Sequence, residues 1–287
     1  MYSVMIDYVV FILTHGRADN VMTYKTLKKC GYTGRIVLVI DNEDKQADEY
    51  YAKYGRDNVF MFDKKAESEK CDTCDNLEDR RVILFARNVC FEIAEKLGYK
   101  YFIELDDDYF GFSYSYASED GKPRERKIKS LDKVFDAMWK FYLSTPAQTI
   151  AMAQRGDFVG GKENDILKNE KLKRKAMNSF FCSTERRFKF FGRINEDVNA
   201  YTTLGSRGVL FFTVPQVALH QEQTQSNKGG MTDIYLDGGT YRKSFYSVIN
   251  MPSAVKVGMM GEYQRLHHNI EWNNAVPRIV SETYRKE

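Results

Sequence analysis

The chain has 287 residues, of which 43% are hydrophobic and 29% are charged, and its net charge is only +3. A chain of this length can bury a substantial core, and its near-neutral charge means that affinity for a polyanion must come from local clusters of basic residues. No apolar run reaches the length of a membrane span and Met1–Asp7 is not a signal peptide, so we expect a cytoplasmic protein without a membrane anchor.

The first third of the chain alternates predicted strands and helices. Runs of β-branched and aromatic residues predict the strands, and polar stretches with apolar residues at helical spacing predict the helices. The predicted strands are Tyr8–Leu13, Arg35–Ile40, Val59–Phe62 and Tyr101–Leu105, and the predicted helices are Asn20–Lys29, Asp44–Tyr54 and Asp79–Lys96. Gly98 is suited to end the third helix. This alternation indicates an α/β fold with a mostly parallel sheet flanked by helices.

The middle of the chain continues with mixed signals. Ser118–Lys129 is charged and holds Gly and Pro, so we expect an exposed loop there. A helix is predicted over Leu131–Leu143, and strands are predicted over Thr149–Ala153 and Val209–Val214. Between those strands, Gly160-Gly161 is a pair at which a backbone can approach a ligand closely.

Two cysteines lie in the polar segment Lys64–Asp79, which we predict to be a surface loop. Cys71-x-x-Cys74 is half of a zinc knuckle, but no second pair or nearby His completes it. The five cysteines of the chain are odd in number and irregularly spaced, which favours reduced thiols. A surface-loop pair is the preferred interpretation, and zinc is the alternative.

Three consecutive carboxylates, Asp106, Asp107 and Asp108, follow the predicted strand Tyr101–Leu105 with no basic residue beside them. Like charges this close repel one another. A hard divalent cation such as Mg²⁺ or Mn²⁺ resolves that repulsion, because it takes oxygen ligands and shares them with substrate phosphates. The alternatives are a solvated acidic turn and a helix N-cap.

Other polar residues share the position of this acidic cluster. Thr14-His15-Gly16-Arg17 follows the first predicted strand, and Asp41 follows the second. In parallel sheets, ligands bind beyond the carboxyl ends of the strands. We therefore expect Arg17, Asp41 and the three aspartates to line one site.

The segment Lys168–Arg193 is the most basic part of the chain, with nine basic residues against two acidic ones. Five phenylalanines are interleaved with these charges: Phe180, Phe181, Phe188, Phe190 and Phe191. Phosphate contacts combined with stacking surfaces are typical of nucleic-acid grooves. The alternative is a solvated basic helix followed by a core strand.

In chain order, these motifs resemble the GT-A-fold glycosyltransferases, which use nucleotide sugars and carry a DxD motif. The resemblance rests on THGR, IDN, ARN (residues 86–88), LDDD, NED (residues 195–197) and a late His, and it covers most of residues 8–222. It implies a Rossmann-like GT-A domain over 1–222, with a C-terminal extension over 223–287 packed on the same domain.

The resemblance also implies roles for individual residues. The UDP-sugar donor would be bound by Thr14, Gly16, Arg17, Asp41, Arg87, Asn88, Asp106 and Asp107. The metal, Mn²⁺ or Mg²⁺, would be held by Asp106, Asp108 and His220. In inverting members the base is an acid of the ED type, here Glu196-Asp197. Taken singly, Glu196-Asp197 could also cap the helix that begins near Val198, and His220 could be a structural residue.

A narrower resemblance is to the TET/JBP-associated glycosyltransferases, many of which are encoded by bacteriophages. It rests on LDDDY, the Gly160-Gly161 pair, NED and the closing RLHHNIEW…VPRI. It implies transfer from UDP-arabinose or UDP-glucose to the hydroxyl of 5-hydroxymethylcytosine in phage DNA, with the target nucleotide extruded or the helix distorted. His267, His268 and Trp272 would cover the donor or acceptor, or else pack the tail onto the sheet.

The sequence is also compatible with three other functions. The first is a GT-A enzyme that acts on a glycan or protein. The second is a sugar nucleotidyltransferase, which the single glycine of THGRADN disfavours. The third is a non-catalytic DNA-binding module, which would leave Asp106–Asp108 unexplained. The oligomeric state is not indicated by the sequence.

Overall fold

The computed structural model describes residues 6–120, 122–154, 173–176, 178–221, 242–260, 265–279 and 281–284. The strands are β1 (Tyr8–Leu13), β2 (Ile36–Asp41), β3 (Val59–Phe62), β4 (Tyr101–Asp106), β5 (Tyr109–Ala117), β6 (Pro123–Lys127), β7 (Thr149–Gln154), β8 (Ser179–Ser183), β9 (Phe211–Gln221), β10 (Val255–Met260) and β11 (Arg265–Ile270). The α-helices are α1 (Met22–Lys29), α2 (Ala47–Tyr54), α3 (Lys64–Ser68), α4 (Leu84–Lys96), α5 (Leu131–Ser144), α6 (Glu196–Ser206), α8 (Trp272–Ala275) and one over residues 242–250. Single 3-10 turns lie at Ala18–Asn20, Arg56–Asn58 and Glu282–Tyr284.

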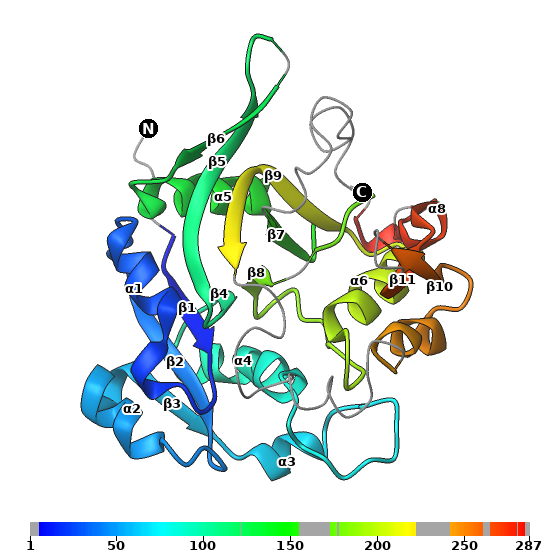
Figure 1. The fold of residues 1–287 in the computed structure, drawn as a ribbon. Coiled ribbons are helices and arrows are strands. Elements are labelled where there is room, and N and C mark those ends of the chain that lie inside the picture. Colours follow the sequence, from blue (N-terminus) through cyan, green and yellow to red (C-terminus); the bar gives the residue numbers. More distant parts are fainter. Residues whose placement is uncertain are drawn as a thin grey trace.

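The centre of the molecule is a nine-stranded sheet in the order β3-β2-β1-β4-β8-β7-β9-β5-β6 (Figure 1). Strands β3, β2, β1 and β4 are mutually parallel, and β7 is parallel to β9. Antiparallel pairing places β8 and β5 opposite in direction to the other seven strands. The prediction of an α/β fold with a mostly parallel sheet is therefore confirmed.

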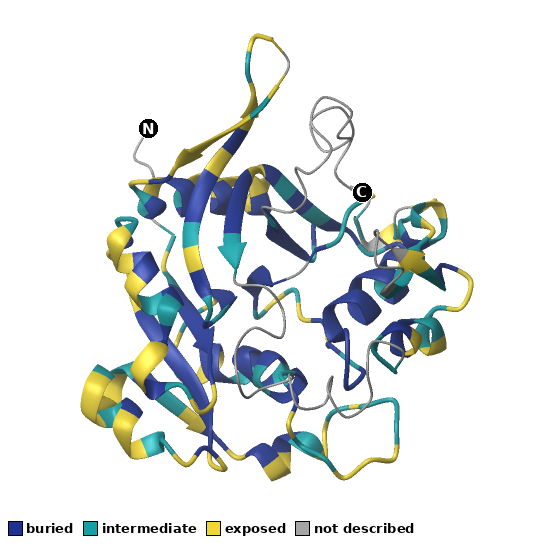
Figure 2. Ribbon diagram, in the orientation of Figure 1, coloured by how far each residue is buried: buried dark blue, intermediate teal, exposed yellow. Residues whose placement is uncertain are grey.

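Helices cover both faces of this sheet because its strands are apolar on both sides. Side chains alternate along β1, so Val9, Phe11 and Leu13 join one core with residues of α4. Val10 and Ile12 point the other way and join a second core with residues of α5. The central strands are consequently buried along most of their length (Figure 2).

Two stretches predicted to be loops contain regular structure. Lys64–Ser68, inside the predicted loop Lys64–Asp79, forms α3, and the Asp63 side chain caps this helix by accepting from the N–H of Ala66. Pro123–Lys127, inside the predicted loop Ser118–Lys129, forms β6 and pairs with β5 as an edge strand. Its side chains are exposed, so its strand character comes from backbone pairing and leaves no apolar alternation to read in the sequence.

The described part of the C-terminal region contacts α6. Tyr201 stacks on Trp272 with ring centroids 5.8 Å apart, and the N–H of Ser281 donates to the carbonyl of Gly208. A Cβ at Gly205 would lie 2.3 Å from the carbonyl oxygen of Ala275. Only glycine allows this close approach of α6 and α8. Separately, none of the helices that the structure describes has the length and apolar character needed to span a bilayer.

Candidate active site

The acidic turn joins β4 to β5, and its middle residue points into the protein. Asp107 accepts hydrogen bonds from the Thr14 hydroxyl at 2.7 Å and from the Arg17 guanidinium at 2.6 Å. The backbone of the turn is held by α1, because the N–H of Thr23 donates to the carbonyl of Asp107. Asp107, Thr14 and Arg17 were all predicted to bind the donor. The structure brings them together, because the side chains of Thr14 and Arg17 both donate to the Asp107 carboxylate.

Asp108 points away from that network. Its Oδ2 accepts a long hydrogen bond of 3.3 Å from Gln221, while its buried Oδ1 has no hydrogen-bond partner among the described residues. Burial, together with the negative charges of Asp106 and Asp107, raises the pKa of Asp108 to about 7. An ionised carboxylate there lacks a counter-charge. A divalent cation fits this position, since it needs only one or two protein carboxylates when phosphate oxygens and water complete its shell.

A cavity of about 240 Å³ opens beside Asp108. It is lined by Gly16, Arg17, Asp19, Asn20, Met22, Gln46 and Asp108. The loop that forms its wall is fixed from behind, because the N–H of Gly16 donates to Asp44 at 2.7 Å and the N–H of Arg17 donates to the Tyr50 hydroxyl at 2.9 Å. The cavity lies at the carboxyl end of β1, as ligand sites in such sheets do.

Asp41 ends β2 and belongs to a small charged group. His15 Nδ1 lies 2.7 Å from its Oδ2, and Lys64 Nζ lies 3.2 Å from the same oxygen. Burial opposes the charge on Asp41, but the His15 hydrogen bond and the Lys64 charge lower its pKa overall. The Asp41 hydrogen bond raises the pKa of His15. This shift favours the protonated, positively charged form of the imidazole, whose side chain is 43% exposed at the edge of the site.

Arg87 lies at the centre of a buried network. Its side chain is 2% exposed; Nη2 donates to Asp106 at 3.0 Å and Nε donates to Glu196 at 2.9 Å. Nη1 lies 3.9 Å from the fully buried Glu104, whose two oxygens have no hydrogen-bond partner among the described residues. The resemblance implies that Arg87 faces the nucleotide; in the structure its guanidinium is enclosed between the two acidic motifs.

Glu196 and Asp197 begin α6, and both are buried. Asn195 precedes them in the left-handed region at φ 57°, held by donation from its amide to the carbonyl of Lys243 at 2.8 Å. The N-terminus of a helix favours negative charge. Nevertheless, burial raises the pKa of Asp197 to about 7, and the neighbouring charge of Glu196 acts in the same direction. A carboxyl group poised in this way can exchange a proton near neutral pH.

Two predicted site residues have other partners. Asn88 makes two hydrogen bonds of 2.9 Å with the backbone of Phe190, so its amide fixes the segment before α6. His220 lies within β9, with its Nε2 2.8 Å from the Ser113 hydroxyl and 3.6 Å from Glu125. Within the described ranges, no three His, Cys, Asp or Glu side chains are arranged to hold a metal ion. The structure thus does not join His220 to Asp106 and Asp108.

The phenylalanines of the basic segment do not form an open stacking surface in its described part. Four of them are buried in the two cores: Phe180, Phe181, Phe188 and Phe190. Arg186 donates to the carbonyls of Thr145 and Ala147, and Arg187 pairs with Glu95. The alternative of a core strand is correct for β8, because the strand lies between β4 and β7. Residues 155–172, with Gly160-Gly161 and the start of the basic segment, lie outside the described residues.

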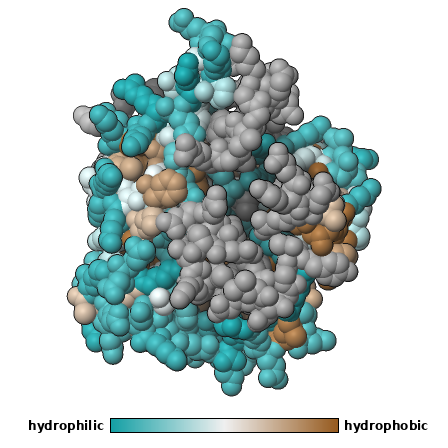
Figure 3. Space-filling model, viewed as in Figure 1, coloured by the Kyte–Doolittle hydropathy of each residue, from teal (hydrophilic) through white to brown (hydrophobic). Residues whose placement is uncertain are grey.

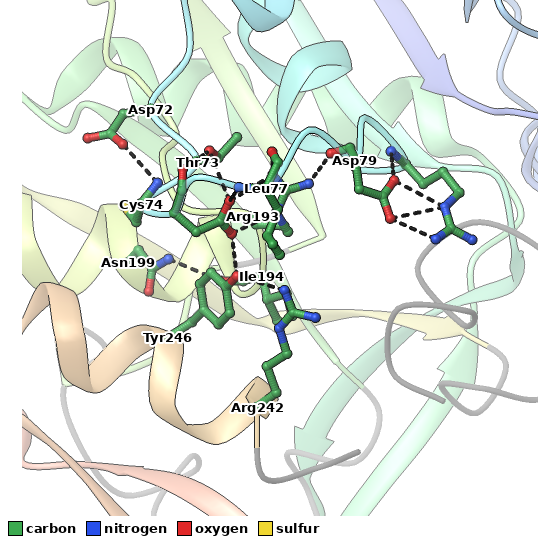
Figure 4. Close-up of polar contacts among 12 residues, drawn as sticks. Asp72, Thr73, Cys74, Leu77, Asp79, Arg193, Ile194, Asn199, Arg242 and Tyr246 are labelled. Carbon is green, nitrogen blue, oxygen red and sulfur yellow. Dashed lines mark hydrogen bonds and ion pairs between the residues drawn. The ribbon is translucent and has the colours of Figure 1, made fainter. Parts of the chain in front are cut away.

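A second buried arginine fixes the loop that carries the cysteines. Arg193 bonds both oxygens of Asp75, at 2.7 and 2.8 Å, and donates to the carbonyls of Leu77 and Asp79 (Figure 4). The Tyr246 hydroxyl donates to the same Asp75 carboxylate. Because Arg193 lies three residues before Glu196, this network ties residues 75–79 and the helix over 242–250 to the start of α6.

The cysteines of that loop have separate partners. Cys71 Sγ accepts from the Asn88 amide at 3.3 Å, and Cys74 Sγ lies 3.3 Å from Asn250 Oδ1. Burial raises the pKa of Cys71 to about 11. Both side chains are free thiols, and these environments favour the protonated thiol over the thiolate that zinc requires.

The three aromatic residues of the tail lie beside α6 and the small β10–β11 sheet. His267 and His268 stack on each other in β11, and Trp272 stacks on Tyr201. Burial lowers the pKa of His268 to about 3, so this ring is neutral at physiological pH. Trp272 packs on α6 through Tyr201, whereas the alternative to covering a ligand was packing against the sheet.

Several residues of the site were not identified from the sequence. His15, Asp44 and Tyr50 support the loop after β1, and Glu104 lies beneath Arg87. The one available signal was Glu104 itself, because a carboxylate within an otherwise apolar strand run must find a buried partner.

The comparisons with known proteins cover most of the chain. The family model for TET-Associated Glycosyltransferase matches residues 8–230. Among solved structures, S. aureus TarS 1-349 in complex with UDP is 12% identical, with 86% of this chain and 66% of that chain covered, at a TM-score of 0.47. The complex of the same TarS fragment with UDP-GlcNAc is also 12% identical, with 86% and 67% covered and a TM-score of 0.49. The chain thus spans about two thirds of those TarS structures. No curated protein matches the chain.

Proposed function

The chain belongs to the TET-associated glycosyltransferase family, and from that premise we propose that it transfers a sugar from a UDP-sugar to the hydroxyl of 5-hydroxymethylcytosine in phage DNA. UDP-arabinose and UDP-glucose are the proposed donors. Family membership agrees with the resemblance found in the sequence. The donor, the metal and the DNA acceptor are the parts of the proposal that need separate support.

The observation that carries the proposal is the bridge made by Arg87. One buried guanidinium contacts Asp106 in the acidic turn and Glu196 in the ED pair, which are 90 residues apart in the sequence. Sugar transfer needs a site for the departing diphosphate and a proton acceptor for the attacking hydroxyl close to each other. The bridge holds the residues proposed for these two tasks in one rigid unit.

On the donor side, the cavity beside Asp108 is proposed to receive the UDP-sugar. Arg17, whose side chain is 23% exposed and lines the cavity, is the cation that can reach a phosphate. Asp108, with Asp106, would hold Mn²⁺ or Mg²⁺, with the remaining positions taken by diphosphate and water. A divalent cation there supplies Lewis-acid stabilisation of the negative charge on the leaving group. His220 is left out of this metal set because it contacts Ser113.

On the acceptor side, Asp197 is the proposed base. In an inverting reaction the hydroxymethyl oxygen bonds to the anomeric carbon, the bond from that carbon to the diphosphate breaks, and the hydroxyl proton passes to the Asp197 carboxylate. The Glu196 carboxylate is held by Arg87 and so is the positioning member of the pair. Asp197 has no such cation bonded to it among the described contacts, which agrees with its raised pKa.

The function is tested by mass spectrometry of nucleosides. DNA containing 5-hydroxymethylcytosine is incubated with the protein, Mn²⁺ and a panel of UDP-sugars, and then digested. We expect the hydroxymethylcytosine nucleoside to gain a pentose or a hexose with one of the donors. Release of UDP without any gain of mass in the nucleosides would move the acceptor to a glycan or protein. No release of UDP with any donor would contradict the proposal as a whole.

The raised pKa of Asp197 predicts the pH profile of the reaction. Because the base acts when deprotonated and its pKa is about 7, kcat should rise about tenfold per pH unit below 7 and level off above it. Steady-state rates between pH 5.5 and 9 check this. Asp197→Asn should abolish the rise together with most of the activity. Asp48→Asn, at an exposed position of α2, is the control that should keep both. A flat wild-type profile would exclude Asp197 as the base.

A further inference from the structure

The hairpin formed by β5 and β6 projects from the body of the molecule at the free edge of the main sheet (Figure 1). Residues Ser113–Ala117 of β5 pair with Pro123–Lys127 of β6. Hydrophilic residues cover this projection at the top of the molecule (Figure 3). All of β6 except the half-buried Pro123 is exposed, so this strand contributes little to the core.

Side-chain alternation sorts the charges of the hairpin onto two faces. Tyr114 is paired with Arg126 and Tyr116 with Arg124, so two tyrosines and two arginines share one face. The tyrosines are 40% and 47% exposed, so both rings are accessible to a partner. Glu125 lies on the opposite face, 3.6 Å from His220.

Asp120 lies close enough to Arg124 for the charge of the arginine to help lower the pKa of Asp120, but the hydrogen bond and ion pair of Asp120 are with other groups. Asp120 is held at the hairpin turn by the Ser118 hydroxyl and by Lys122, which pairs with it at 3.0 Å. The basic character continues at the base of the hairpin, where α1 contacts β5. Lys29 at the end of α1 and Lys127 of β6 both lie close enough to Cys30 to lower its pKa electrostatically.

The hairpin is also connected to the catalytic residues by a single strand. β5 begins at Tyr109, directly after Asp108, and reaches Tyr116 seven residues later. At about 3.3 Å per residue this distance is about 23 Å, which corresponds to about seven base pairs of duplex. A duplex that lies along the hairpin would therefore extend toward the acidic turn at Asp106–Asp108.

We propose that the β5–β6 hairpin is a clamp for the acceptor duplex, with Arg124 and Arg126 on its phosphates and Tyr114 and Tyr116 against its sugars or an unstacked base. A two-stranded ribbon has the dimensions of a DNA groove, and arginines with exposed aromatic rings are the pair of groups that bind phosphates and bases. The inference rests on the proposed DNA acceptor and adds to it the surface that grips the DNA outside the catalytic centre.

The test compares two double variants that each lose two positive charges. Arg124→Gln/Arg126→Gln alters the clamp, and Arg56→Gln/Lys65→Gln is the matched control at the opposite edge of the sheet, around β3. Binding of a fluorescent 24-base-pair duplex is measured by anisotropy at several salt concentrations. The clamp variant should bind about tenfold more weakly. The slope of log K against log salt concentration should become shallower by the amount expected for the loss of about two phosphate contacts. The control should match the wild type.

Transfer assays separate this inference from the proposed function. Loss of the clamp should lower kcat/KM for hydroxymethylcytosine in the 24-base-pair duplex and leave it unchanged for the hydroxymethylcytosine mononucleotide, which cannot reach the hairpin. Tyr114→Ala/Tyr116→Ala should behave similarly with a smaller change in salt dependence. If the wild type modifies DNA and the clamp variants bind and modify the duplex as well as the wild type, the clamp is wrong and the function stands. If the wild type neither binds nor modifies DNA, both fall.

Discussion

Replacement of Asp108 by Asn is expected to lower kcat at least a thousandfold while the protein stays folded. Asn keeps the size of the side chain but removes the charge that attracts a divalent cation beside the diphosphate. UDP release in the presence of saturating Mn²⁺ measures the loss. Because a positioned cation contributes several kcal/mol of transition-state stabilisation, the reduction should appear in kcat and persist when the donor concentration is raised.

The same variant should be as stable as the wild type or more stable. Burial and the neighbouring carboxylates raise the pKa of Asp108 to about 7, above its ordinary value. Between those two pH values the folded state holds more protons than the unfolded chain, so ionisation of Asp108 reduces stability as the pH rises. Asn removes this cost, and the gain in Tm should be larger at pH 8 than at pH 5. Asp48→Asn serves as the control with no change in either property. Full turnover by Asp108→Asn would exclude the metal role.

Replacement of Arg87 by Met is expected to cost about 3–5 kcal/mol of unfolding free energy at pH 8. The guanidinium is 2% exposed and faces Asp106, Glu196 and Glu104, so its loss leaves a group of buried carboxylates without a cation. The deficit should shrink as the pH is lowered to about 5, because the buried carboxyls take up protons and lose their charge. Urea unfolding at the two pH values measures it.

A second substitution tests whether charge, and not packing, explains the effect. Arg87→Met/Glu104→Gln removes one of the buried acids along with the cation and should recover part of the stability at pH 8. Glu104→Gln alone, which leaves Arg87 bound to Asp106 and Glu196, should be close to neutral or stabilising. An equal deficit for Arg87→Met at both pH values would mean that the lost volume and not the unpaired carboxylates is responsible. In either case the activity should fall, since Arg87 positions both acidic motifs.

Local sequence was sufficient to predict the strands of the N-terminal half. β1 and β3 have the predicted bounds, and β2 is displaced by one residue. Each is a short apolar run ended by polar residues, and that pattern is a property of neighbouring residues alone. The same holds for the end of α4, where Gly98 takes a positive φ of 79° after the last helical residues.

Predictions about partners were less successful, because a partner lies far away in the chain. The sequence gives no sign that Asp107 turns inward to Thr14 and Arg17 while Asp108 is left with an unpaired oxygen. Nor does it show whether an arginine in a helix is exposed: Arg87 is buried because Glu196, 109 residues later, supplies a charge to pair with it.

The sequence by itself therefore determined the α/β class, the position of the acidic residues at the carboxyl end of a central strand, and the family. The class and the position of the acidic residues depend on composition and periodicity over a few residues, and the family follows from the resemblance of its motifs. Only the tertiary structure decided which carboxylate of the acidic turn keeps an oxygen without a hydrogen-bond partner among the described residues, that the basic Phe-rich segment contributes a core strand, and that an exposed, charged stretch forms the second strand of a hairpin. Each of these depends on pairing between distant segments, whose free energy comes from burial and hydrogen bonds that no local pattern encodes.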